Sequence, residues 1–319
     1  MVYNNSRQVV AAGIMSAITV MLTLISMYIP ILGALANLVL PLPIILTGVR
    51  HGLKWSIMVI VVAAIIAMFL MGPLNAVQIV VTFGLTGIVF GYAIRAKMSA
   101  GPMILWGAVA GLVSMGITIV LAAVVMGIDP LQMEFSVMEQ STSQVLDYYR
   151  SAGLDEQQVA MVETSMRAMI DTVRIIFPAF IAVGSVLMAY VTFILSRKII
   201  NRTGYNMAGL PAFKNWVLPP YVLYIFILGF IISYVGKYQQ IEAAITIGEN
   251  LKWCGISFTF VQGLSVFYYL ADKYKLSRLM RGIILLLIFT NLVYQYILVF
   301  GGAFEIALDY RRLRKPRLS

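Results

Sequence analysis

The sequence predicts an all-α fold: a polytopic helical membrane protein with about eight to nine transmembrane helices and an extracytoplasmic helical hairpin. Hydrophobic residues make up 61% of the 319 residues and charged residues only 11%, which is more apolar surface than a water-soluble domain can bury. The apolar residues also gather in runs of about 20, the length of a helix that crosses a hydrocarbon core of roughly 30 Å. In lipid, such a run satisfies its backbone polar groups only as a helix.

Nine runs fit this length, and the count carries an error of about one. They cover residues 9–28, 31–49, 55–71, 77–94, 103–127, 175–196, 216–235, 251–271 and 283–300. Pro41 and Pro43 interrupt the second run, and because proline lacks a backbone N–H they predict a kink or a break into two half-helices. We expect the first run to be an uncleaved helix rather than a secretory signal, because it exceeds a signal core in length and further runs follow at once.

Basic residues in the short joints predict the orientation. They follow the second, fourth, sixth and eighth runs, at Arg50, Lys54, Arg95, Lys97, Arg197, Lys198, Arg202, Lys214, Lys273, Lys275, Arg278 and Arg281. The joints at 29–30 and 72–75 carry no charge. Because basic joints stay cytoplasmic, we expect a multi-pass protein of the inner (cytoplasmic) membrane with a cytoplasmic N-terminus. Nine crossings would leave the basic residues of 311–317 outside, whereas a re-entrant return near Gly301 and Gly302 would keep them inside, which their number favours.

The net charge of +10 is explained by these joints, which attract anionic lipids, so we expect the lipid bilayer as a partner and no nucleic acid. The chain has one cysteine, Cys254, and one histidine, His51, and no zinc, phosphate-loop or nucleophile-elbow motif. The sequence therefore predicts no enzyme, no metal site and no cofactor. No charged residue falls at the centre of a run, and Glu242 and Glu249 are expected at an outer interface. This argues against a transporter coupled through an intramembrane carboxylate.

Residues 129–171 form the long polar stretch of the chain, with eight acidic and two basic residues. Apolar residues recur in it at alternating spacings of three and four, which is typical of an a/d seam. They are Leu131, Phe135, Met138, Thr142, Val145 and Tyr149 before Gly153, and Val159, Val162, Met166, Met169 and Val173 after it. Asp155 and Gln158 fit a capping box. We predict an antiparallel helical hairpin that extends outward by about 20–30 Å, as a packed protrusion, a lid or a docking site.

Polar residues inside the runs are the candidates for a solute site, because they are costly in lipid. The substrate-binding candidates are Asn37, Asn75, Gln78 and Thr82. Of these, Asn37 beside Pro41 and Pro43, and Asn75 with Gln78 beside Pro73, lie towards the predicted outer helix ends. The alternative is that such amides, with Gln262, Asn291 and Gln295, bond helix to helix.

Small residues at four-residue spacing let membrane helices approach closely. The first run has Ala12, Gly13, Ser16 and Ala17, and later runs have the pairs Gly87/Gly91 and Gly107/Gly111. These faces either pack internally or, on the first run, dock another membrane protein.

Several segments of the chain resemble known families. Residues 11–17, 29–33, 40–43, 48–52 and 72–75 read AAGIMSA, IPILG, LPLP, GVRHG and GPLN. This layout resembles the S components, the six-helix substrate-binding subunits of energy-coupling-factor transporters. The whole chain, with GAFEIALDYRR at 302–312, looks like the YybS-like family of bacterial polytopic membrane proteins, a family of unknown function.

The resemblance to S components implies that the protein captures a vitamin or metal ion from outside and couples to a transmembrane subunit driven by separate ATPases. Carried over to this chain, the coupling face would be Ala12, Gly13, Ser16 and Ala17, and the capture site would lie near Asn37, Asn75 and Gln78.

We therefore expect three parts. Residues 1–202 form an S-component-like six-helix bundle that includes the hairpin 129–171, residues 203–302 add C-terminal membrane helices, and residues 303–319 form a basic tail. The expected function is a solute-binding or transport-associated component without its own ATPase. The alternative is a non-transporting scaffold or regulator that recruits partners through the hairpin or the tail.

Overall fold

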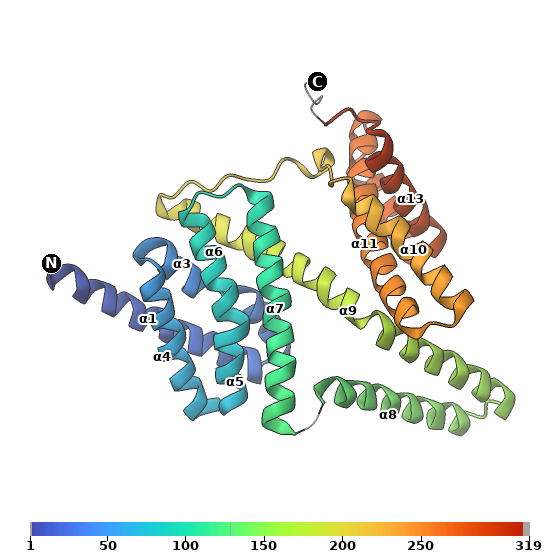
Figure 1. Cartoon of the computed structure of the whole chain (residues 1–319), viewed down its shortest axis with the longest axis horizontal. Helices are drawn as coiled ribbons and strands as arrows, with labels where there is room; N and C mark the ends of the chain where they lie inside the picture. Colours follow the sequence, from blue (N-terminus) through green and yellow to red (C-terminus); the bar gives the residue numbers. More distant parts are fainter. Residues whose placement is uncertain (1, 128, 315–319) are drawn as a thin grey trace. The chain divides into compact units, whose positions relative to one another are not determined.

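The computed structural model describes residues 2–127 and 129–314, and within these residues every regular element is helical (Figure 1). The elements are α1 (Val2–Tyr28), α2 (Pro30–Val39), α3 (Leu42–His51), α4 (Leu53–Met71), α5 (Pro73–Gln78), the π-helix η1 (Ile79–Gly84), α6 (Leu85–Arg95), α7 (Ala100–Met126), α8 (Pro130–Ser151), α9 (Glu156–Ile200), the 3₁₀-helices η2 (Asn201–Thr203) and η3 (Phe213–Asn215), α10 (Tyr221–Gln239), α11 (Glu242–Lys273), α12 (Arg278–Thr290) and α13 (Leu292–Leu308). The predicted all-α fold is confirmed.

Eight helical segments of the described chain are long and apolar enough to cross a membrane. They are Ser6–Tyr28, Pro30–His51, Leu53–Met71, Pro73–Arg95, Ala100–Val124, Glu156–Thr203, Tyr221–Gln239 and Glu242–Lys273. Each overlaps one of the first eight predicted runs, although the fifth run was predicted to extend to 127 and the seventh to begin at 216, outside the observed segments. The second is interrupted between α2 and α3, at Leu40 and Pro41, which confirms the predicted break.

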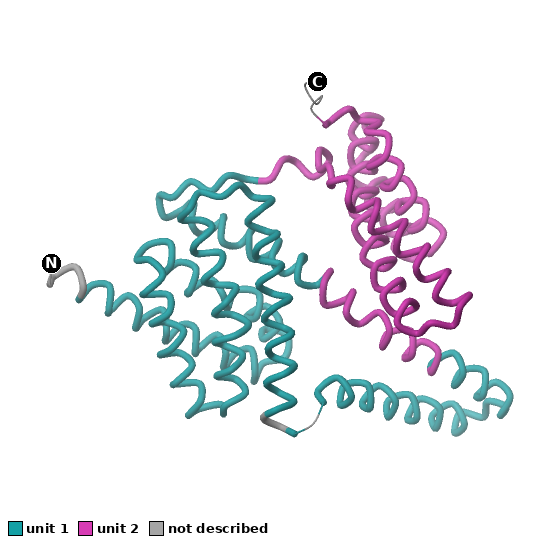
Figure 2. Tube along the Cα trace, viewed as in Figure 1, with its two compact units in different colours: residues 1–166, 184–209 teal, residues 167–183, 210–319 magenta. Residues whose placement is uncertain are grey.

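The chain forms two compact units (Figure 2). Unit 1 comprises Met1–Met166 and Gly184–Gly209, and unit 2 comprises Arg167–Val183 and Leu210–Ser319. The long helix α9, of 45 residues, contributes to both units.

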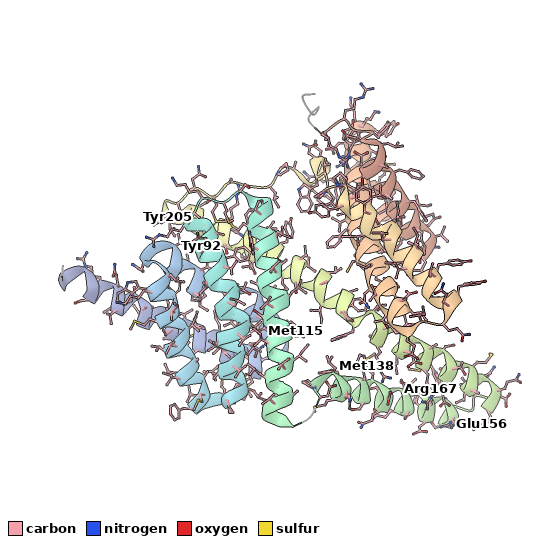
Figure 3. The ribbon with its side chains drawn as sticks, viewed as in Figure 1. Tyr92, Met115, Met138, Glu156, Arg167 and Tyr205 are labelled. Atoms are coloured by element: carbon pink, nitrogen blue, oxygen red, sulfur yellow. The ribbon has the colours of Figure 1, made fainter. Side chains whose placement is uncertain are left out.

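Unit 1 is packed through apolar clusters on α1, α3, α4 and η1. One cluster contains Ala12, Leu40, Ile44, Val59, Ile60 and Phe83, and a second contains Val20, Ala63, Ala64, Ala67 and Ile79. Hydroxyl groups add hydrogen bonds to backbone oxygens of α3. Ser56 Oγ donates to the backbone oxygen of Ile44 at 2.9 Å, and Tyr205, labelled in Figure 3, donates to that of Val49 at 3.4 Å.

Glycine closes both ends of α4. Gly52 and Gly72 have φ angles of +95° and +88°, which side chains other than glycine rarely adopt. The two turns reverse the chain sharply, so that α4 runs between the basic residues around His51 and the uncharged joint at Pro73. This gives unit 1 a basic end and an uncharged end.

The hairpin consists of α8 and the first part of α9, joined by a turn with Gly153 at φ +84° (Figure 3). Phe135, Leu146 and Val159 are buried on its inner faces. The predicted seam is wrong by one residue in two places: Leu146 and Ile170 are buried, whereas Val145 and Met169 are exposed. Asp155 is the N-cap of α9, as predicted, but its side chain makes no capping hydrogen bond.

Unit 2 is built on an antiparallel pair, α10 and α11, whose backbones come very close. A Cβ added to Gly236 would lie 2.7 Å from Ile245 N, and one added to Gly255 would lie 2.5 Å from Phe226 Cα. Helix α13 packs on α11 in the same way, because a Cβ at Gly302 would overlap the backbone oxygen of Thr259. Glycine therefore permits this packing by removing the side chain between helices.

The ninth predicted run, 283–300, is not a single straight helix. It is broken at Asn291 between α12 and α13, which are bent by 104°. Beside the break, the Phe289 ring lies 5.8 Å from the ring of Phe260 on α11. Phe260 is about 20 Å along α11 from Lys273, the last residue of that helix, at 1.5 Å per residue. The break therefore lies far from the end of α11 at which α12 begins.

Both ends of the α12–α13 pair lie at the same end of unit 2. Arg281 of α12 forms an ion pair with Asp272 at 2.7 Å, and Tyr310, after α13, has its ring 5.9 Å from Lys273 Nζ. The pair therefore enters from one end of unit 2 and returns to it, as a re-entrant hairpin does. The described part of the tail lies beside the basic joint 273–281, and the reversal occurs at Asn291 rather than at Gly301 and Gly302.

Candidate functional site

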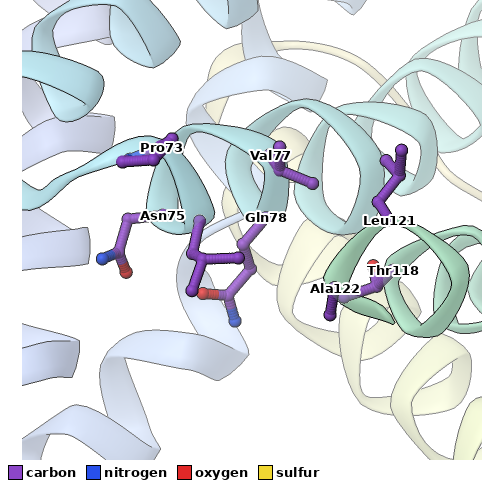
Figure 4. A pocket seen from close by; sticks show the side chains of 8 residues that line it. Pro73, Asn75, Val77, Gln78, Thr118, Leu121 and Ala122 are labelled. Carbon is purple, nitrogen blue, oxygen red and sulfur yellow. The ribbon is translucent and has the colours of Figure 1, made fainter. Parts of the chain in front are cut away.

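A pocket of about 180 Å³ opens at the uncharged end of unit 1. Its walls come from the start of the fourth membrane segment and from the last turns of α7 (Figure 4). The lining residues are Pro73, Leu74, Asn75, Val77, Gln78, Thr118, Leu121 and Ala122. The pocket thus contains two of the four residues predicted to bind a solute, Asn75 and Gln78.

The two amides lie on one face of α5 because they are three residues apart (Figure 4). Asn75 Nδ2 donates to the backbone oxygen of Met71 at 2.9 Å, so this amide is partly used to cap α4. Among the described residues, the carboxamide of Gln78 has no hydrogen-bond partner. Its donor and acceptor groups are therefore available to a bound molecule.

The helix adopts a π conformation directly after Gln78, over Ile79–Gly84. Helix α7 supports this turn, because Ser114 Oγ donates to the backbone oxygen of Val81 at 2.8 Å. The hydroxyls of Thr82 and Thr118 lie 3.3 Å apart. π-Helical turns are rare and often occur at functional sites. Here the turn fixes the end of α5 that carries Gln78 against the pocket wall of α7.

The other two predicted residues do not line the pocket. Thr82 reaches it only through its contact with Thr118. Asn37 belongs to the contact between α1 and α2, where its Oδ1 accepts a 2.7 Å bond from Ser26 Oγ. The α7 wall was missing from the sequence prediction, although the hydroxyls of Ser114 and Thr118, four residues apart, mark that face of α7.

The pocket is neutral, because no Asp, Glu, Lys, Arg or His is among its lining residues. A neutral, mainly apolar wall with one free carboxamide favours a small uncharged molecule, since an ion would lose its hydration without gaining a partner. In residues 2–127 and 129–314, no group of three or more His, Cys, Asp or Glu side chains is placed to hold a metal ion.

Unit 2 contains polar networks that are fully paired. Glu249, expected at an outer interface, is only 8% exposed between α10 and α11. Its carboxylate accepts a 2.7 Å bond from Ser233 and pairs with Lys237 and Lys252 at 2.8 and 2.5 Å. Ser233 and Lys237 reach the carboxylate from α10, whereas Lys252 lies three residues further along α11 itself, so the charge of Glu249 is neutralised near the start of α11.

Arg311 connects several segments at the opposite end of unit 2. Its guanidinium is buried and donates to Glu305 Oε1 at 2.7 Å, to the backbone oxygens of Lys214 and Trp216, and to Ser265 Oγ at 2.9 Å. Two basic residues of the described tail are thus committed to the fold, because Arg314 also donates to the backbone oxygen of Ile306.

The predicted docking residues on α1 divide between two faces. Ala12 and Ser16 are each 1% exposed, and Ser16 Oγ donates to the backbone oxygen of Val59 at 3.3 Å, so this pair packs against α4. Gly13 and Ala17 are exposed, and nothing lies within 4 Å of a Cβ placed on Gly13.

The helices and the apolar composition define a polytopic α-helical integral membrane protein, embedded in the lipid bilayer with multiple spans. Residues 17–304 match the DUF2232 family of predicted membrane proteins, and the chain belongs to this family. It is similar to the uncharacterized protein YybS of Bacillus subtilis (strain 168), with 23% identity over 311 residues that cover 96% of this chain and 98% of YybS. No solved structure matches the chain.

Proposed function

We propose that this protein is a solute-binding component of a membrane transport assembly, similar in role to the S components, and that it binds a small uncharged molecule in the pocket of unit 1. The observation that carries this proposal is the unpartnered carboxamide of Gln78 in a neutral pocket beside a π-helical turn. The proposed function is binding and delivery rather than catalysis.

The size of the pocket supports a small ligand. Pockets for drug-sized ligands enclose roughly 300–1,000 Å³, and this one encloses about 180 Å³. It therefore suits a compact molecule or one polar group of a larger one. Gln78 would fix its orientation by a paired donor and acceptor, and Leu121 and Val77 would cover its apolar part.

The proposed orientation follows from the charges at the two ends of unit 1. The uncharged end, with the pocket, faces the outside, and the basic end and the N-terminus face the cytoplasm of an inner-membrane protein. A coupling subunit with separate ATPases would then dock on the exposed small residues Gly13 and Ala17, which permit close approach of another helix. Ala12 and Ser16 support this face from within.

The test is ligand-dependent thermal stability of the purified protein. A panel of uncharged vitamins, nucleobases and amides, each paired with a charged analogue, is added to the wild type and to Gln78→Leu. A true ligand at 100 times its Kd adds about 2.7 kcal/mol of apparent stability, and Gln78→Leu should remove this gain. Gln239→Leu, the same change at an exposed position of α10, is the matched control. A panel that leaves all three proteins unchanged would count against the proposal.

A second candidate function is a scaffold that recruits proteins through the hairpin. The observation in its favour is an exposed, uncharged stripe on α8, described below. Purification from native membranes in mild detergent separates the two functions. Recovery of a transmembrane coupling subunit with ATPases supports transport, whereas recovery of other proteins, lost when the hairpin is changed, supports the scaffold.

A further inference from the structure

Helix α8 has two apolar faces, of which only one is used within the hairpin. The inner face contains Phe135, Thr142 and Leu146, which are buried. The opposite face contains Met133, Val137 and Tyr148, whose exposed fractions are 53%, 50% and 69%. These three large side chains lie in line on one face of a polar helix.

This second face is a continuous stripe with coiled-coil spacing. With Gln140 and Gln144, both exposed, the three residues recur at intervals of four, three, four and four. At 3.6 residues per turn they fall within about 80° of one another, opposite the buried face. Such spacing is typical of a helix that packs along another helix. We name Met133, Val137, Gln140, Gln144 and Tyr148 the outer stripe.

Charge is excluded from the outer stripe although the hairpin is acidic. Residues 129–171 carry eight acidic and two basic residues, and on α8 the acidic residues Glu134, Glu139 and Asp147 all lie beside the stripe or on the hairpin side of it. A second hairpin of this protein carries the same negative charge, so a contact between two copies must keep the acidic side chains out of the buried surface, where salt does not screen their repulsion. The outer stripe supplies that surface.

The order of residues along the stripe is also self-complementary. In an antiparallel pair of α8 helices related by a two-fold axis near residues 140 and 141, Met133 meets Tyr148 and Val137 meets Gln144 of the other copy. Each large apolar residue at one end is thus matched by a large or amphipathic residue at the other. An interface with two-fold symmetry requires this kind of self-matching.

From these observations we propose that the outer stripe is a dimer interface, at which α8 pairs antiparallel with α8 of a second copy of this chain. The partner is the same protein, and the contact lies on the extramembrane hairpin rather than within the bilayer. The proposal does not depend on the pocket or on its ligand.

Cysteine crosslinking tests this geometry. In a Cys254→Ser background, which removes the one cysteine of the chain, Gln140→Cys places a thiol beside the two-fold axis, and Ser143→Cys places one about 60–100° away on the same helix. A disulfide needs Cα atoms within about 7 Å. Oxidation in native membranes should convert Gln140→Cys to a disulfide-linked dimer and leave Ser143→Cys a monomer.

A substitution on the intact protein completes the test. Val137→Glu should abolish the dimer measured by light scattering in detergent or by single-molecule counting in bilayers, whereas Ser143→Glu should retain it. An unchanged thermal unfolding midpoint shows that the hairpin still folds in both variants. The proposal is overturned if the wild type is a monomer, if Gln140→Cys crosslinks only to a different protein, or if both cysteines crosslink equally.

Discussion

Unit 1 and unit 2 hold their membrane helices together in different ways. Unit 1 joins its helices through apolar clusters and single hydroxyl bonds, such as that from Ser56 to Ile44. Both units also have close glycine contacts, at Gly33 and Gly87 in unit 1 and at Gly255 and Gly302 in unit 2, but unit 2 adds buried charges, at Glu249 and at the Glu305–Arg311 pair. The carboxylates and the guanidinium of these networks in unit 2 are paired, whereas in unit 1 the Gln78 carboxamide is left open.

We relate this difference to the roles of the two units. A buried charge network fixes one arrangement of helices, because breaking it leaves an uncompensated charge at low dielectric. A neutral bundle with an open pocket and a π-helical turn keeps polar groups for a ligand. We infer that unit 2 is a rigid module and that unit 1 is the binding module. Four substitutions test this contrast, from the largest expected effect to the smallest.

Arg311→Met should have the largest effect. It removes four donated bonds and leaves the Glu305 carboxylate buried and unpaired, so we expect a loss of about 3–5 kcal/mol in the free energy of unfolding. Chemical denaturation in detergent measures it. Arg312→Met, at the exposed neighbouring position, should stay within about 0.5 kcal/mol of the wild type. Equal effects of the two substitutions would show that the buried pair does not hold unit 2 together.

Gly302→Ala should cost about 1–3 kcal/mol, because the added Cβ overlaps the backbone of α11, which cannot move aside like a side chain. Gly301 provides a matched control, since nothing lies within 4 Å of a Cβ placed there. Gly301→Ala should be neutral or stabilising by about 0.5–1 kcal/mol, the helix preference of alanine over glycine. Thermal unfolding of the two variants compares them directly, and a stable Gly302→Ala would mean that α13 does not pack closely on α11.

Asn250→Leu should cost about 1–2 kcal/mol. Pro178 interrupts α9, and the Asn250 amide fills the opened turn by accepting from Ala179 N at 2.8 Å and donating to the backbone oxygen of Ile175 at 2.7 Å. Pro178→Ala allows the turn to close on itself, so the double variant should recover part of the loss. Strictly additive effects in a double-mutant cycle would exclude this coupling.

Ser114→Ala, in unit 1, should have the smallest effect on stability, about 0.5–1.5 kcal/mol for one lost hydrogen bond. The loss of ligand affinity should be larger than this loss of stability alone would produce, because Ser114 holds the π-helical turn next to Gln78. Ligand affinity and unfolding midpoint are measured on the same variant. Ser257→Ala, which loses a bond within α11 of unit 2, should change neither the affinity nor the pocket.

The sequence predicts the helices of this fold well because hydropathy reports on length and lipid exposure. It also predicts the break before Pro43, since proline has a local effect on its own helix. The break at Asn291 has no such local signal. Asn291 and Gln295 read as polar residues within a span, but Asn291 Oδ1 accepts from Val293 N, and Gln295 Nε2 donates to the backbone oxygen of Phe289, so both cap the break.

The sequence alone does not predict contacts that depend on how two helices are aligned with each other. Glu249 is buried because α10 brings Ser233 and Lys237 to it, and a single run of sequence does not show that pairing. The same holds for the pocket. Asn75 and Gln78 share one short helix and were predicted as polar residues of a membrane run beside Pro73, whereas Thr118 and Leu121 belong to a wall that only the packing of α7 supplies.

The measurement that tests the central claim most directly is native mass spectrometry of the protein released from its own membranes in mild detergent. We predict that the wild type and Gln239→Leu carry a bound small molecule and that Gln78→Leu has lost it while remaining folded. A bound molecule that persists at the same occupancy in Gln78→Leu would contradict the account, because the free carboxamide of unit 1 would then not be its binding group.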